Sequence, residues 1–158
     1  QALYDGFVPS KHLDIRDVWN EIWREGEIPP EEMTEIALEE NKDRMVAHYY
    51  QPHAPFVGEK RTEDFLEESL GEKDHDLDAK MWEKVEAGKI TDDELWELYI
   101  SNLRRALESV KELVEKTDYD NVVITADHGE ALGEYGIYGH PKHIDHPKVR
   151  IVPWMRIR

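Results

Sequence analysis

The sequence predicts an α/β fold, and three segments carry that prediction. Residues 44–50 are rich in β-branched and aromatic side chains and end at Pro52, as a strand does before a loop. Residues 91–116 begin with a capping box and continue with apolar residues at helical spacing. Residues 121–125 form an apolar, β-branched strand that charged residues follow directly. This order is typical of α/β proteins, whose chemistry lies at the carboxyl ends of strands.

The remaining elements follow from apolar spacing and from chain breakers. Residues 13–23 predict an amphipathic helix that Gly26 stops, and a second helix begins at Pro30 and runs to about Asp43. Residues 149–157 predict a last strand. The charged segment 58–90 is interpreted as a polar excursion with short helices near 63–70 and 78–85. We expect the helix at 91–116 to bury one face, formed by Leu95, Tyr99, Leu103, Leu107, Val110 and Val114.

Composition excludes several function classes. The 158 residues include 36 Asp and Glu against 20 Lys and Arg, for a net charge of -16, which argues against nucleic acid and anionic lipid as partners. The absence of cysteine excludes thiolate metal sites and a cysteine nucleophile. No apolar run is long enough to span a membrane. The first residues resemble no signal peptide, which leaves the compartment unassigned but favours the cytoplasm. The five tryptophans are interpreted as packing anchors: Trp19, Trp23, Trp82, Trp96 and Trp154.

Asp127 and His128 are the first candidates for chemistry, because they follow a buried strand and precede a glycine. A carboxylate beside an imidazole suits Ca²⁺, Mn²⁺ or Zn²⁺. From the dipeptide alone, the alternative is an aspartate that caps a helix beside an exposed histidine.

Two longer blocks widen that view. Residues 125–140, Thr-Ala-Asp-His-Gly-Glu-Ala-Leu-Gly-Glu-Tyr-Gly followed by Tyr-Gly-His, together with Arg-Ile-Val-Pro-Trp at 150–154, resemble the carboxy-terminal motif of sulfatases in the alkaline phosphatase superfamily. Residues 46–56, with Pro-His-Ala-Pro-Phe at their end, are similar to that family's anion-binding loop. The resemblance implies an alkaline phosphatase-like sandwich, with a mostly parallel central sheet flanked by helices. It also implies that residues 1–158 form only the carboxy-terminal part of the catalytic domain.

The resemblance also implies roles for individual residues. Asp127 and His128 would ligate one divalent metal, with Ca²⁺ favoured over Mn²⁺ and Zn²⁺. His53 would hold the sulfate or phosphate group of a small anionic ester, and His140 would contact the same group and donate a proton to the leaving alkoxide. A single metal is favoured because no Asp lies close before His53.

The chain departs from the family at its amino-terminal side. The family's nucleophile signature is absent, since Ser10 is followed by Lys11-His12-Leu13 with no Pro or Arg in register. We therefore expect the isolated chain to be inactive and to require the missing amino-terminal half or a second copy as a partner. The expected function is sulfuric ester hydrolysis. The alternatives are a phosphonate or phosphodiester hydrolase, a phosphoethanolamine-type transferase, and a non-catalytic interaction domain.

Three further groups of residues invite a functional interpretation. His143, Asp145 and His146 could bind a second metal, although the flanking prolines favour a loop with solvent-facing histidines. Residues 74–76, Asp-His-Asp, are interpreted as a solvated loop, and Lys148 as a surface cation.

Overall fold

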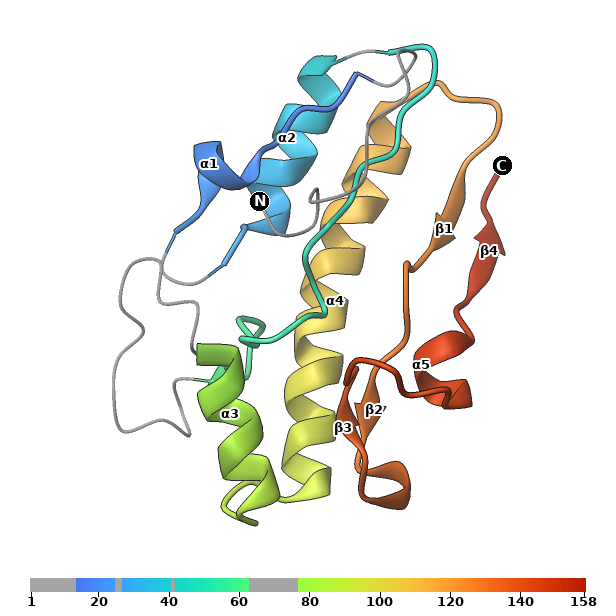
Figure 1. Ribbon diagram of the computed structural model, residues 1–158. Helices are drawn as coiled ribbons and strands as arrows, with labels where there is room; N and C mark the ends of the chain where they lie inside the picture. Colours follow the sequence, from blue (N-terminus) through green and yellow to red (C-terminus); the bar gives the residue numbers. More distant parts are fainter. Residues whose placement is uncertain (1–13, 25–26, 41, 63–76) are drawn as a thin grey trace.

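A long central helix, α4 (Asp92–Lys116), runs the length of the molecule in the computed structural model, and the other elements lie around it (Figure 1). The structure describes residues 14–24, 27–40, 42–62 and 77–158. Helix α2 (Pro30–Glu40) packs along one end of α4. Helix α3 (Leu77–Glu86) packs beside the other end, where its Met81 and Val85 share a core with Leu95 and Leu98. Among the described helices, none is long and apolar enough to cross a membrane.

The start and end of α4 confirm the prediction for residues 91–116. The backbone N–H of Glu94 donates to Oγ1 of Thr91 at 3.3 Å, and Oε2 of Glu94 accepts from the Thr91 N–H at 2.8 Å. Two amides that the helix cannot bond internally are satisfied in this way, so the short motif fixes the first residue of the helix.

The buried face of α4 differs from the predicted one. The residues that face the core are Leu95, Leu98, Asn102, Ala106, Ser109 and Leu113. Leu107, predicted to be inward, is 40% exposed. The buried face is shifted because the polar residue Asn102 is buried, where it forms hydrogen bonds with the loop at 53–57. Apolar periodicity does not detect a buried polar residue.

Two hydrophobic clusters hold the elements together. The first joins the loop around Phe56 to α3 and α4, and its partly buried rim includes Trp82 and Tyr138. The second surrounds Ile22, Ile28 and Met33 at the other end of the molecule, and Tyr49 and Tyr50 pack against it. The chain between residues 47 and 56 contributes to both clusters and links them.

The strands form two short antiparallel ribbons. Strand β1 (Val123–Thr125) pairs with β4 (Trp154–Arg156), and β2 (Ala131–Leu132) pairs with β3 (Tyr138–Gly139). A 3₁₀ turn, η2 (Glu134–Gly136), joins β2 to β3, and helix α5 (Pro147–Arg150) precedes β4. The β1–β4 ribbon lies on the side of α4 away from α2 (Figure 1), and the β2–β3 ribbon lies near the start of α4, where β3 contacts α3 and β2 contacts α4.

The predicted alkaline phosphatase-like sandwich with a mostly parallel central sheet is wrong for this structure. Each described sheet has two strands, and both pairs are antiparallel. A parallel sheet needed residues 44–50 to pair with β1, but this segment is extended without forming a strand. It packs on helices instead, as Oγ1 of Thr34 in α2 and the Tyr49 hydroxyl share a 2.7 Å hydrogen bond.

Other predicted boundaries are corrected or confirmed by the described residues. The helix predicted at 13–23 is reduced to α1 (Trp19–Ile22). The strand predicted at 149–157 divides into α5 and the shorter β4. The helix predicted from Pro30 to about Asp43 is confirmed as α2, which ends three residues early, and the one predicted near 78–85 is confirmed as α3. The helical pattern at 63–70, the stop at Gly26 and the tract at 74–76 lie outside the described residues.

Candidate metal and anion site

Three histidines from distant parts of the sequence meet beside α4. His53 lies in the loop after the extended segment, His128 follows β1, and His140 follows β3. The ring centroids of His53 and His140 are 5.2 Å apart, and those of His128 and His140 are 4.2 Å apart. We call these three residues the histidine cluster. All were predicted as site residues, and the fold brings them together.

A glycine sets the position of His128. The Gly129 N–H donates to the Val149 carbonyl at 2.8 Å, so the loop after β1 lies directly on the segment before β4. A Cβ atom at residue 129 would lie 2.0 Å from the carbonyl oxygen of Lys148. Only glycine permits this approach, and the sequence Asp-His-Gly therefore has a packing reason beside any chemical one.

His53 is positioned by α4. Its backbone N–H donates to the Tyr50 carbonyl at 3.1 Å, and its own carbonyl accepts from Nδ2 of Asn102 at 3.2 Å. Oδ1 of Asn102 also accepts from the Val57 N–H at 3.3 Å, and the residue is fully buried. Asn102 thus connects the helix to the loop on both sides of Phe56. The sequence analysis missed this residue, because a polar side chain in a helix carries no local signal of tertiary contacts.

Glu130 holds the third histidine. Both of its carboxylate oxygens lie 3.0 Å from Nδ1 of His140, and its side chain is only 8% exposed. Burial, followed by the nearby charge of Glu130, raises the pKa of Tyr99. Glu130 lies within the sulfatase-like motif at 125–140, but no role was predicted for it from the sequence. A buried carboxylate beside an imidazole fixes the tautomer and strengthens the other nitrogen as a metal ligand or proton acceptor.

Hydrogen bonds also fix the tautomers of His128 and His53. Nδ1 of His128 lies 2.9 Å from the carbonyl oxygen of Gly129, and Nδ1 of His53 bonds the carbonyl of Ala54. Because a carbonyl only accepts, each Nδ1 carries the proton and each neutral ring has its lone pair on Nε2. The cluster therefore offers imidazole nitrogens of defined tautomer.

Asp127 lies at the outer side of the cluster and is 60% exposed. Its Oδ1 accepts from the His128 N–H at 3.0 Å, and its Oδ2 lies 3.9 Å from Nε2 of His128. His48, which the sequence analysis left without a role, brings its Nε2 to 3.6 Å from the same oxygen. The helix-cap alternative for Asp127 is excluded, since strand β2 and not a helix follows.

The donor atoms around His128 fit a divalent ion on either side. The 3.9 Å between the Asp127 oxygen and the His128 nitrogen is compatible with one ion about 2.0–2.4 Å from each. Ligand atoms of His128, Glu130 and His140 also lie within 4.8 Å of one another, which forms a second possible set among the described residues. The assignment of Asp127 and His128 stays a prediction, and the geometry adds Glu130 and His140 as candidates.

The segment that contains His143 and His146, the alternative site for a second metal, has structural contacts. Nδ1 of His146 accepts from the Lys148 N–H at 3.2 Å and caps α5, and its ring contacts Tyr135. Lys148 forms an ion pair with Glu134 at 3.2 Å. These contacts agree with the interpretation of this segment as a surface loop.

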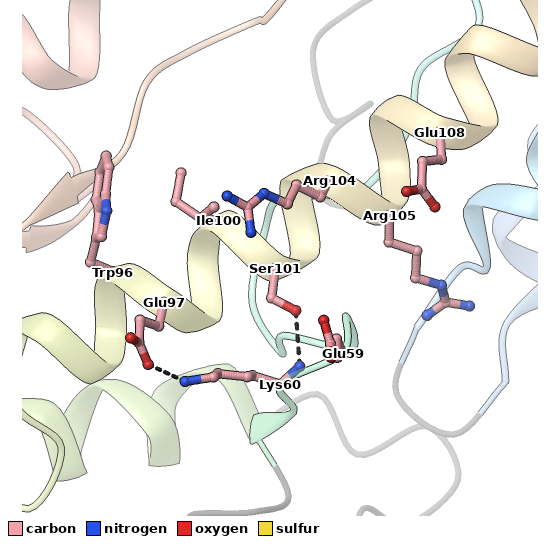
Figure 2. A pocket seen from close by; sticks show the side chains of 9 residues that line it. All are labelled: Glu59, Lys60, Trp96, Glu97, Ile100, Ser101, Arg104, Arg105 and Glu108. Atoms are coloured by element: carbon pink, nitrogen blue, oxygen red, sulfur yellow. Dashed lines mark hydrogen bonds and ion pairs between the residues drawn. The ribbon is translucent and has the colours of Figure 1, made fainter.

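A larger groove lies elsewhere, on the face of α4 between Trp96 and Glu108 (Figure 2). Its volume is about 570 Å³, but no member of the histidine cluster lines it. Three of its charged side chains are paired, since Lys60 bonds Glu97, as Figure 2 shows, and Arg105 bonds Glu27 and Glu31. Size alone does not make it the chemical site, because convergent titratable groups lie at the histidine cluster.

Comparison with known proteins gives no family for this chain: no family model, no curated protein and no solved structure matches it.

Proposed function

We propose that this chain supplies the anion- and metal-binding residues of a sulfatase-like hydrolase. The observation that carries the proposal is the meeting of His53, His128 and His140, which the sequence motifs had named independently of their distance in space. A chain with a net charge of -16 repels an anionic ester, so a site for one needs its own local source of positive charge. A divalent ion held at the histidine cluster would provide such a source.

The proposed chemistry divides between the residues. Asp127 and His128 would hold one divalent ion, Ca²⁺ by preference and otherwise Mn²⁺ or Zn²⁺, which would neutralise charge on the ester oxygens. His53, protonated on Nε2, would donate a hydrogen bond to the sulfate group. A nucleophile that we do not assign to this chain would form a bond to the sulfur as the bond between sulfur and the ester oxygen breaks. His140, as an imidazolium that Glu130 stabilises, would give its Nε2 proton to the departing alkoxide and become neutral. We assign no nucleophile to this chain and expect it to be inactive alone.

Paramagnetic broadening by Mn²⁺ tests the metal assignment without an activity assay. We expect the NMR signals of His128 and His140 to broaden first on titration, and Asp127→Asn to reduce the effect. His146 is the internal control, since its ring caps α5. Uniform broadening of all histidines, or broadening unchanged by Asp127→Asn, would contradict the assignment. We expect weak binding, because only part of a full ligand set is assigned to this chain.

The choice between sulfate and phosphoryl substrates needs rates. Phosphonate and phosphodiester hydrolases and phosphoethanolamine-type transferases would use the same anion-binding groups with a different nucleophile. Paired rates of the whole protein on an aryl sulfate and an aryl phosphodiester would separate them. A dominant sulfatase rate is expected, and a dominant phosphodiesterase rate would reverse the order.

A non-catalytic interaction domain is the second candidate, and the β1–β4 ribbon favours it. Trp154 is 74% exposed, Ile151 is equally exposed, and Met155 is 49% exposed. Exposed apolar groups on a short ribbon with open edges are typical of surfaces that another chain covers. A partner, either an amino-terminal part of the same enzyme or a second copy, is compatible with both candidate functions.

A further inference from the structure

A small cavity adjoins the histidine cluster at His140. It is lined by Trp82, Tyr138, Gly139, His140 and Pro141, and its volume is about 240 Å³. A cavity of about 150 Å³ is enough for benzene in other proteins, so this one has room for one substituted ring. His140 belongs both to this cavity and to the cluster, and no other residue does so.

The walls of the cavity are held from several elements. Trp82 comes from α3, within the charged excursion, and packs on the core cluster around Phe56. Tyr138 packs on the same cluster, and its hydroxyl donates to Oδ1 of Asp92 at 2.8 Å. The ring of Tyr138 is thus fixed at both ends, which makes it a preformed surface.

Gly139 brings the indole close to the cluster. It has a φ of 71°, and a Cβ there would lie 3.6 Å from Cε2 of Trp82 and 3.4 Å from Oε1 of Glu130. The indole of Trp82 and the Glu130 carboxylate that bonds His140 therefore both lie against the Cα of Gly139. A molecule that spans the two sites has its junction at His140.

We propose that this cavity binds the organic part of the ester as a planar aromatic ring, with Trp82 and Tyr138 as specificity-determining residues. Two aromatic side chains and a proline form flat, largely apolar walls, which favour a flat ring over a puckered one of similar size. The proposal rests on the proposed function, because it requires the charged group of the same molecule to lie at the histidine cluster.

Binding of small sulfate esters to the 158-residue chain in excess CaCl₂ tests the proposal. We expect phenyl sulfate to bind about tenfold more tightly than methyl sulfate, and about threefold more tightly than cyclohexyl sulfate. Trp82→Ala should remove the preference, so that phenyl sulfate and methyl sulfate bind with similar affinity. Trp96→Ala is the matched control, because Trp96 is 55% exposed and lines the groove of α4 but not the cavity, and it should change neither affinity.

A second measurement keeps the test valid if Trp82→Ala fails to fold. In the unaltered chain, intermolecular NOEs from the phenyl protons should reach the indole of Trp82 and the ring of Tyr138. NOEs to other residues only, or equal affinities of phenyl and methyl sulfate, would overturn the aromatic cavity. Phenol that binds as tightly as phenyl sulfate, while methyl sulfate does not bind, would instead overturn the anion site and leave the cavity standing.

Discussion

The imidazole rings of His53 and His140 lie edge to face with their centroids 5.2 Å apart, although α3 and α4 separate them along the chain. Helix α4 makes this contact possible. Asn102 bonds the backbone of His53, and Leu95 and Leu98 share a core with Leu132 of the hairpin that carries His140. The geometry of the candidate site therefore depends on the packing of one helix against two loops.

Replacing Asn102 tests that dependence. Asn102→Leu leaves the Val57 N–H and the His53 carbonyl buried without their partner, so we expect the free energy of unfolding to fall by about 1–3 kcal/mol. Methyl sulfate affinity should fall as well, since His53 loses its anchor. Urea unfolding and calorimetry measure the two effects. Asn121→Leu is the control, because Asn121 bonds Arg156 on the surface; an equal loss in both variants would refute the positioning role.

Glu130→Gln tests the carboxylate behind His140. The substitution keeps the shape of the side chain and removes its charge, so the fold should persist. Mn²⁺ affinity is expected to fall by about tenfold, because a Glu130 oxygen lies within 4.8 Å of a donor atom of His128 and its negative charge attracts the ion. Glu97→Gln is the control. It removes a carboxylate that bonds Lys60 in the groove of α4, and it should leave the Mn²⁺ affinity unchanged. Equal affinities of Glu130→Gln and the unaltered chain would exclude a role for Glu130.

Gly129→Ala tests the close approach of the loop after β1. The new methyl group would lie 2.0 Å from the Lys148 carbonyl, so the backbone at 127–130 must move. We expect loss of Mn²⁺ binding together with a lower unfolding temperature. Gly88→Ala is an informative comparison: its Cβ meets no atom within 4 Å, but its φ is 69°, so it should destabilise the chain slightly and leave metal binding intact.

Replacing Arg105 should make the free energy of unfolding depend on pH in a new way. Its guanidinium bonds Glu27, Glu31 and the Val57 carbonyl, each at 2.8 Å. Burial raises the pKa of Glu27, while Arg105 acts in the opposite direction. Arg105→Met leaves this carboxylate buried without its cation, and the expected loss of unfolding free energy at neutral pH is roughly 2–4 kcal/mol.

The sign of the pH dependence follows from Glu27. A carboxyl group whose pKa is higher in the folded than in the unfolded chain favours the fold at low pH, and this contribution is lost as the pH rises through the folded pKa. Without Arg105 that pKa rises further, so the deficit of Arg105→Met should narrow as the pH falls from 7 towards about 4. Urea titrations at several pH values measure it. A deficit that widens on acidification would contradict this account, and the exposed neighbour in Arg104→Met should show no such dependence.

Trp154 tests whether the β1–β4 ribbon is covered by a second copy. With this indole exposed, we expect the chain to self-associate as its concentration rises, and Trp154→Ser to shift it towards the monomer. Light scattering after gel filtration measures the mass, with Trp96→Ser as the matched exposed control. A monomer at every concentration, or an equal shift in both variants, would rule out self-association through the ribbon.

Local signals in the sequence predicted local structure well. The capping box at Thr91 and Glu94 defined the start of α4 because its hydrogen bonds lie within four residues. Pairing between strands could not be predicted in the same way. Residues 44–50 have the composition of a strand, but Tyr49 and Tyr50 gain more by packing against α1 and α2. Trp96 and Trp154 were predicted to be packing anchors, but they are 55% and 74% exposed. The sequence shows that a residue is apolar, but it does not show whether the fold places another surface against it.

The site was predicted in part. His53, His128 and His140 were named from the motifs, and the structure brings them together. Glu130, His48 and Asn102 were missed, because their roles depend on which loops meet. The sequence does contain one signal for Glu130: it is an acidic residue two positions after His128 and directly before the segment that forms β2.

The origin of the three histidines in separate loops also has a thermodynamic consequence. An anion or ion that binds between them can bind only the folded chain, because unfolding places His53, His128 and His140 far apart. Binding must then raise the melting temperature in proportion to the logarithm of ligand concentration once the site is saturated. A thermal melt in a series of sulfate esters would therefore rank their affinities directly, on a chain that needs no turnover to report them.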